Sequence, residues 1–252
     1  MKRILITRPR AQADDFAGKL RAAGFEPIFF PVIEIRPIEN NVALERALAK
    51  LERYDWIVFT SANAVEVVSD VVARSGAMSA ATKQSPKVAA IGPKTAEALH
   101  RRGITPDFVP AEYVAEAILP GLGDVRGKWV LLPRAEIARK ALPEAIIKAG
   151  GSPHEIAVYQ TLPAQPDPEG LAALQSGVDI VTLTSPSTVQ NFMAIARQSG
   201  LDPLRLPGNP LFACIGPITE QAAREDGLVN LVVAREYTTE GLTEAIRNLE
   251  AS

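Results

Sequence analysis

The sequence is poor in the residues that form disulfides, metal sites and catalytic triads. Its 252 residues include one cysteine and two histidines. The lone Cys214 excludes a disulfide framework, and its apolar neighbours predict a small buried hydrophobic residue. Neither His100 nor His154 lies beside a cysteine or an acidic cluster in the sequence. We therefore expect no zinc site and no Ser-His-Asp triad.

Long apolar runs and nucleotide-binding motifs are also missing. No stretch approaches the roughly 18 to 20 apolar residues that span a membrane, and the apolar run in the opening MKRILITRPR is too short for a signal peptide. We therefore expect a cytoplasmic protein without membrane contact. No G-x-x-x-x-G-K-[ST] loop is present, and GLGDVRG at 121–127 is a turn without a following helix. The net charge of −2 argues against a nucleic-acid partner.

What the sequence does contain is a long internal repeat. Three segments recur 124 residues later in the chain: TSANAV at 60–65 as TSPSTV at 184–189, IGPKTAEAL at 91–99 as IGPITEQAA at 215–223, and AEYVAEAI at 111–118 as REYTTEGL at 235–242. Three pairs at one spacing strongly support a duplicated unit. We therefore predict two copies of one α/β half, each about 125 residues long.

Short apolar strands alternate with helical stretches in both copies, which predicts parallel sheets covered on both faces. The expected strands are 4–6, 56–59, 88–91, 108–109, 129–132, 180–183, 212–215 and 231–233. The expected helices are 11–23, 42–53, 62–73, 93–102, 114–122, 136–149, 186–198, 217–226 and 240–249, and 75–86 is an expected loop. Prolines bound two further extended stretches, 25–38 and 152–163. Because proline cannot donate to a ladder, we expect edge or linker strands there.

Four helices are expected to begin directly at the carboxyl end of a strand, at Ser61, Gly92, Ser185 and Gly216. Open α/β sheets bind ligands at those ends, and a helix start offers unpaired N–H groups and a positive dipole end. Two halves facing each other would bring four such starts to one cleft, which suits a ligand with several negative groups. The same turns are ordinary caps in most α/β proteins, so a purely structural role stays open.

Two pairs of equivalent residues could add to these contacts. Thr95 and Thr219 occupy the same position in IGPxT, where a hydroxyl either faces a ligand or bonds its own backbone. Arg8 and Arg134 lie 126 residues apart and follow equivalent strands. Each arginine either holds a carboxylate or forms a surface ion pair of little energetic worth.

The sequence resembles the uroporphyrinogen-III synthase family, cofactor-free enzymes of tetrapyrrole synthesis. The resemblance covers essentially the whole chain and rests on ITRP at 6–9, FTSANAV at 59–65, AIGPKTAEAL at 90–99, VYQT at 158–161, LTSPSTVQNF at 183–192, IGPITEQAA at 215–223 and YTTEGLTEAI at 237–246. It implies two similar doubly wound, flavodoxin-like parallel-sheet domains joined by a two-stranded β linker. The domains would be 1–36 plus 164–252 and 39–155, and the linker 25–38 with 152–163.

The reaction implied by this resemblance is the cyclisation of linear hydroxymethylbilane, with loss of water and inversion of the last pyrrole ring, ring D. The expected partner is therefore a small molecule that carries eight carboxylates. We also expect the enzyme to be a monomer. Loss of the hydroxyl leaves an azafulvene, so the main task is to hold the chain folded for attack by ring D. We expect substrate contacts at Arg8, Ser61, Ala62, Asn63, Gly92, Lys94, Thr95, Arg134, Ser185, Ser187, Gly216 and Thr219.

The family's tyrosine in the second linker strand corresponds to Tyr159, the expected catalytic residue. In EIAVYQT, period-two alternation places Ile156 and Val158 on one face and Tyr159 on the other. We therefore expect Tyr159 to face away from those two residues. Its phenol would then donate a proton to the departing hydroxyl, or would merely pack the hinge. A non-catalytic, two-lobed ligand-binding protein is the alternative function that these features fit.

Overall fold

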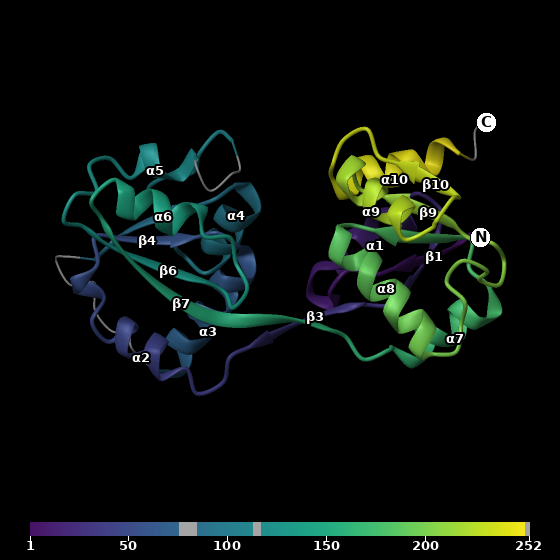
Figure 1. Cartoon of the computed structure of the whole chain (residues 1–252), viewed down its shortest axis with the longest axis horizontal. Helices are drawn as coiled ribbons and strands as arrows, with labels where there is room; N and C mark the ends of the chain where they lie inside the picture. The colour runs from purple at the N-terminus through teal and green to yellow at the C-terminus, as the bar shows by residue number, and fades with distance from the viewer. Residues whose placement is uncertain (76–84, 113–116, 250–252) are drawn as a thin grey trace. The chain divides into compact units, whose positions relative to one another are not determined.

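The protein consists of two α/β units (Figure 1). The computed structural model describes residues 1–75, 85–112 and 117–249. Unit 1 is formed by Met1–Glu34 with Leu162–Ser252, and unit 2 by Ile35–Thr161. Each unit contains a five-stranded sheet.

The sheet of unit 1 has the strand order β10-β9-β8-β1-β2, and its four ladders are parallel. Read from β2, this is the doubly wound, flavodoxin-like order 2-1-3-4-5. The strands are β1 (Arg3–Ile6), β2 (Glu26–Phe29), β8 (Ile180–Leu183), β9 (Leu211–Cys214) and β10 (Leu231–Val233). The helices are η1 (Arg10–Gln12, a 3-10 turn), α1 (Asp14–Ala22), α7 (Pro168–Ser176), α8 (Pro186–Gln198), α9 (Pro217–Glu225) and α10 (Thr239–Asn248).

Helices cover both faces of this sheet. Helices α1 and α10 bury Phe16, Leu20, Leu242 and Ile246 against one face. On the other face Phe192 of α8 meets Phe30 and Phe212 edge to face, with ring centres 6.4 and 5.9 Å apart. Cys214 at the end of β9 is a free, buried thiol, which confirms the expected hydrophobic role.

The sheet of unit 2 has the order β3-β7-β6-β4-β5. The strands are β3 (Ile33–Pro37), β4 (Trp56–Phe59), β5 (Lys87–Ala90), β6 (Trp129–Ala135) and β7 (Ser152–Pro163). The helices are α2 (Val42–Leu48), η2 (Leu51–Arg53, a 3-10 turn), α3 (Ala62–Ser75), α4 (Pro93–Arg101), α5 (Ile118–Gly121) and α6 (Ala141–Lys148). Helices α2, α3 and α4 pack on one face, and α5 and α6 on the other.

The ladders of the two sheets correspond residue for residue. Strand β1 pairs with β8 so that Ile4 lies opposite Ile180, and β6 pairs with β4 so that Val130 lies opposite Trp56. Val130 follows Ile4 by 126 residues, and Ile180 follows Trp56 by 124. Strands β1 and β2 therefore correspond to β6 and β7, and β8 and β9 to β4 and β5. The two copies are circularly permuted, since unit 1 takes its equivalents of β6 and β7 from the start of the chain.

The two proline-bounded stretches pair in part, because β3, from the second half of 25–38, lies beside β7, which forms from 152–163. The stretch 25–38 divides into β2, at the edge of one sheet, and β3, at the edge of the other. The stretch 152–163 forms β7, an inner strand between β3 and β6 rather than an edge strand. This is compatible with its prolines because Pro153 and Pro163 lie near the two ends of β7, leaving the interior N–H groups to the ladder. The chain passes between the units inside β3 and again inside β7.

Several element boundaries also differ from the sequence prediction. The helix expected from 136 begins at Ala141, because β6 continues to Ala135 and a turn follows. The strand expected at 108–109 is reduced to a single bridge between Phe108 and Ala89. Most of the loop expected at 75–86 and the start of the helix expected at 114–122 lie outside the described residues.

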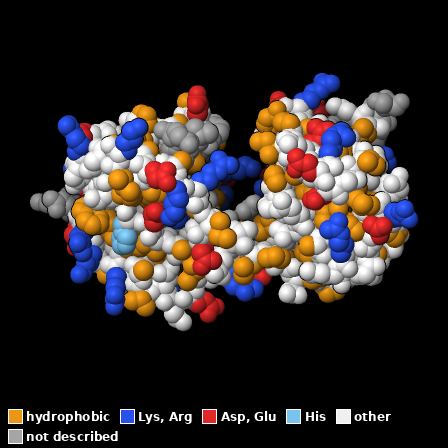
Figure 2. All heavy atoms as spheres, viewed as in Figure 1, with side chains coloured by type: hydrophobic (Ala, Val, Ile, Leu, Met, Phe, Trp, Pro, Cys, Tyr) orange, Lys and Arg blue, Asp and Glu red, His pale blue; other side chains and the backbone are white. Residues whose placement is uncertain are grey.

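The visible surface carries both signs of charge. Figure 2 shows Lys and Arg side chains interspersed with Asp and Glu side chains on each unit, in keeping with the net charge of −2. Among the helices in the described ranges, none has the length and apolar composition required to cross a bilayer.

Candidate functional site

In each unit the predicted ligand contacts gather at the carboxyl edge of the parallel strands. Arg8 follows β1 and Ser185 follows β8 in unit 1, whereas Ser61 follows β4 in unit 2. The connection after β1 leads to β2 at one edge of the sheet, whereas the connection after β8 leads toward the other edge. The connections after β6 and β4 diverge in the same way in unit 2. Ligands of open α/β sheets bind at such switch points, so each unit has one candidate crevice.

The two serine helix starts are ordinary caps. The Ser61 Oγ accepts the N–H of Ala64 at 3.1 Å. Ser185 forms a capping box with Thr188, whose N–H lies 3.2 Å from the serine Oγ, and the Ser185 Oγ lies 2.9 Å from the Ser187 Oγ. Both serines therefore have the structural, helix-capping role that the sequence predicts as the alternative to ligand binding.

The two glycine helix starts are different. Within the described residues no side chain caps α4 at Gly92 or α9 at Gly216, so these two helix starts lack the capping contact that Ser61 and Ser185 provide at α3 and α8. Thr95 and Thr219 in those turns are only 4% and 3% exposed, and no hydrogen bond joins either hydroxyl to another described residue. Because these two starts lack a capping side chain, they are the better candidate anion sites.

Three further predicted contacts lie in the first turns of the unit 2 helices. Ala62 and Asn63 are half-buried at the start of α3, and Lys94 is exposed at the start of α4. Lys94 therefore adds a solvent-facing ammonium beside the uncapped start at Gly92.

The Tyr159 side chain is buried beside one of these helix starts. It is 6% exposed, and its hydroxyl donates to the Ser61 Oγ at 3.1 Å. It belongs to the same apolar cluster as Ile156 and Val158, so the prediction that it faces away from them is wrong.

A β-bulge explains this error. Arg134 of β6 lies opposite Ala157 of β7, but the next residue, Ala135, lies opposite Tyr159. Val158 is thus an extra residue in the ladder, and a bulge of this kind breaks the alternation of side chains along the strand.

The contact between Tyr159 and Ser61 orients a pair of hydroxyls. The Ser61 Oγ accepts from both Tyr159 and the N–H of Ala64. A serine hydroxyl has one proton of its own to donate, and Ser61 is half-buried whereas Tyr159 is buried. A ligand at this edge would therefore meet the Ser61 hydroxyl first, with Tyr159 behind it.

The two equivalent arginines have different surroundings. Nη1 of Arg134 donates to Glu155 Oε2 at 2.6 Å, and Nη2 donates to the carbonyl of Arg139. The Arg134 side chain is 11% exposed, so its guanidinium is engaged inside the protein rather than offered to a ligand.

Arg8 keeps more of its guanidinium unused. Within the described ranges its one hydrogen bond runs from Nη2 to the Oε1 of Gln12, at 3.3 Å. Burial lowers the pKa of Arg8 below its ordinary value, although the carboxylates of Asp15 and Glu240 act in the opposite direction. A partly desolvated guanidinium without a close ion-pair partner is suited to a carboxylate ligand.

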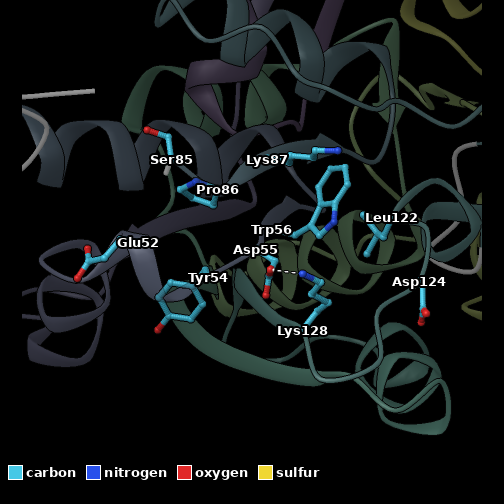
Figure 3. Close-up of a pocket in the computed structure, with 10 residues that line it drawn as sticks. All are labelled: Glu52, Tyr54, Asp55, Trp56, Ser85, Pro86, Lys87, Leu122, Asp124 and Lys128. Carbon is cyan, nitrogen blue, oxygen red and sulfur yellow. Dashed lines mark hydrogen bonds and ion pairs between the residues drawn. The ribbon is translucent and has the colours of Figure 1, made fainter. Parts of the chain in front are cut away.

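A cavity of about 510 Å³ lies at the opposite, amino edge of the unit 2 sheet (Figure 3). It is lined by Glu52, Tyr54, Asp55, Trp56, Ser85, Pro86, Lys87, Leu122, Asp124 and Lys128. Lys87 lies beside the Trp56 indole, and Asp55 pairs with Lys128 at 2.8 Å. Asp179, the counterpart of Asp55 in unit 1, likewise accepts a main-chain N–H at the start of a strand. The carboxylate therefore belongs to the shared fold, and the cavity is separate from the candidate site.

Comparison with known proteins identifies the family. The family model described as uroporphyrinogen-III synthase HemD matches residues 14–244. The chain belongs to the uroporphyrinogen-III synthase family. A uroporphyrinogen-III synthase of Synechococcus elongatus is 35% identical over 252 residues, covering 97% of this chain and 94% of the relative. A putative member from Methanothermobacter thermautotrophicus is 29% identical over 251 residues, covering 96% of each chain.

Solved structures of the family share the fold. A mutant uroporphyrinogen III synthase of Thermus thermophilus aligns with a TM-score of 0.62 and 21% identity, covering 100% of both chains. The Helicobacter pylori protein aligns with a TM-score of 0.65 and 18% identity, covering 99% of this chain and 100% of its own. The prediction of two doubly wound parallel-sheet domains is thus confirmed.

Two features of the unit 2 edge were missed from the sequence. One is the hydroxyl pair, because Ser61 and Tyr159 lie 98 residues apart and meet only through the bulge in β7. The other is Arg139, an exposed cation in the turn after β6. The only signal for it was its place just beyond a strand end, within the stretch expected to be helix.

The described residues contain no group of three or more His, Cys, Asp and Glu side chains placed to hold a metal ion.

Proposed function

We propose that this chain is a uroporphyrinogen-III synthase, a lyase that cyclises hydroxymethylbilane to uroporphyrinogen III with loss of water and inversion of ring D. The observation that carries this proposal is the 35% identity to the Synechococcus elongatus enzyme over 97% of the chain. The proposal includes monomeric action in the cytoplasm and no resident cofactor.

The helix starts of α4 and α9 supply the contacts for a polycarboxylate. Their N–H groups and dipole ends attract anions, and the hydroxyls of Thr95 and Thr219 add a donor to each. Arg8 adds a guanidinium in unit 1 and Lys94 an ammonium in unit 2. Contacts spread over backbone and side chains suit a substrate with eight carboxylates.

The pair of hydroxyls at the unit 2 edge supplies the proton for dehydration. In this step the bond between the hydroxymethyl carbon and its oxygen breaks, and the pyrrole ring supplies the electron pair that forms the azafulvene as its N–H proton passes to solvent, from which Tyr159 is later reprotonated. Ser61 gives a proton to the departing oxygen, which leaves as water, and Tyr159 gives its proton to Ser61. Because the leaving group departs easily, positioning of ring D supplies most of the rate acceleration.

The product isomer tests this function. Freshly prepared hydroxymethylbilane closes spontaneously to isomer I, so the protein is incubated with it and the products are oxidised and separated by chromatography. We expect isomer III to dominate. A non-catalytic binding protein, the alternative function, would hold part of the bilane unchanged. The rest would close spontaneously, so isomer I would be the sole product.

A further inference from the structure

We propose that Arg139 is a substrate-binding residue of unit 2 and that Arg134 is the positioning residue that presents it. The identity of the ligand, a carboxylate of the tetrapyrrole substrate, rests on the proposed function. The assignment of the two roles rests on the turn between β6 and α6, residues 136–140.

The first half of this turn is fastened to β7. The N–H of Glu136 donates to the carbonyl of Tyr159 at 2.9 Å. Nε2 of Gln160 donates to Glu136 Oε2 at 3.0 Å. The turn thus leaves the sheet beside β7, the strand that carries Tyr159.

The second half is fastened by Arg134 and Glu155. The Arg134 guanidinium joins Glu155 of β7 to the carbonyl of Arg139. The Lys140 ammonium also pairs with Glu155, at 3.2 Å. This network is mostly shielded, since the side chains of Arg134 and Glu155 are 11% and 29% exposed. Both halves of the turn are therefore held in place.

The Arg139 side chain is the part of this turn that remains available. It is exposed, and no described residue forms an ion pair or hydrogen bond with its guanidinium. Arginine presents a planar fork of donors that matches a carboxylate, and its fixed main chain reduces the entropy lost on binding. A long cation on a fixed turn at a switch point is arranged to bind an anion.

The duplicated unit provides an internal comparison. At the spacing of 126 residues, Arg8 corresponds to Arg134, Ala13 to Arg139 and Phe29 to Glu155. Unit 1 therefore has no carboxylate at the position of Glu155 and no cation at the position of Arg139, and Asp15 and Glu240 act on Arg8 without a direct hydrogen bond to it among the described residues. Instead, Phe29 lies under the Arg10 guanidinium, 3.6 Å from the ring centre. Each unit thus has one arginine just after the equivalent strand, β1 or β6, whose guanidinium can bind a ligand carboxylate. This residue is Arg8 in unit 1 and Arg139 in unit 2.

Steady-state kinetics of matched variants test the two roles. Wild-type protein must first form isomer III, because its failure to do so would refute the proposed function rather than this inference. For Arg139→Gln we expect the KM for hydroxymethylbilane to rise by about tenfold with kcat within about twofold, as for a lost charge-assisted contact. Lys148→Gln removes the same charge at the far end of α6 and should leave KM unchanged.

The role of Arg134 is tested by non-additivity. Arg134→Gln should raise KM by a similar factor to Arg139→Gln, and the double variant should be no worse than either single variant. If Arg134→Gln does not fold, Glu155→Gln replaces it, since it loosens the same network while leaving Arg134 in place. An unchanged KM in Arg139→Gln would overturn the proposal. A multiplicative effect in the double variant would overturn the positioning role, because it would mean that Arg134 binds substrate independently.

Discussion

Replacing Tyr159 with phenylalanine tests whether this residue donates a proton or only packs in the core. The ring stays in its cluster, so the change removes only the hydroxyl that donates to Ser61. Ser61 still accepts the N–H of Ala64, so the cap of α3 survives and no acceptor is left unpaired. Losing one neutral hydrogen bond should lower the free energy of unfolding by about 1 kcal/mol.

The effect on catalysis should be larger than the effect on folding. If Tyr159 feeds a proton through Ser61, Tyr159→Phe should lower kcat by about 10- to 100-fold and leave KM nearly unchanged. The assay is the initial rate of isomer III formation, corrected for spontaneous closure. Tyr54→Phe is the matched control, because its hydroxyl lies 2.6 Å from His154 Nδ1 at the amino edge of the same sheet. That variant should retain full turnover.

Ser61→Ala completes the test. It removes the cap, costing about 1 kcal/mol, and leaves the buried Tyr159 hydroxyl unpaired, costing about 1–3 kcal/mol more. Combining it with Tyr159→Phe should therefore restore stability relative to Ser61→Ala alone, without restoring turnover. Full turnover in a well-folded Tyr159→Phe variant would refute the proton relay and leave catalysis to positioning.

Three further predictions concern other parts of the protein. Replacing Thr95 and Thr219 together with valine should raise KM several-fold while changing stability by less than about 1 kcal/mol, since neither hydroxyl bonds a described residue; unchanged kinetics would limit both threonines to packing. Burial raises the pKa of Cys214 to about 12, so the folded protein should resist thiol reagents at pH 8 and react once unfolded; rapid labelling of the folded protein would contradict this. A hydrogen bond from Lys19 holds the pKa of Glu240 at about 2, below its ordinary value of about 4.3. The resulting stability is present above pH 4.3 and lost as the pH falls toward 2; because the Glu240 side chain is 60% exposed, Glu240→Gln should cost less than about 1 kcal/mol at pH 7 and nothing at pH 2, as urea midpoints would measure.

The fold was largely predictable because duplication leaves a record in the sequence. The spacings of 124 and 126 residues recur in the ladders themselves, where Ile4 lies opposite Ile180 as Val130 lies opposite Trp56. Strand order was not encoded in these spacings. The resemblance to a known family supplied it, since the sequence pattern alone also fits two consecutive halves.

The site was less predictable because its decisive contacts are long-range. The extra residue Val158 turns Tyr159 into the core, and no local pattern marks a bulge. Arg8 and Arg134 look equivalent, yet only Arg134 meets a carboxylate, because Glu155 lies on the neighbouring strand where unit 1 has a phenylalanine. Duplication therefore preserved the position of the arginine but not its partner.

A uroporphyrinogen-III synthase determines which isomer of the product forms. The most direct measurement is the fraction of isomer III among the products as the protein concentration is raised, at a fixed amount of fresh hydroxymethylbilane. We expect this fraction to rise from near zero towards completion, in step with the initial rate. Isomer I as the dominant product at every protein concentration, at the rate found without protein, would contradict it.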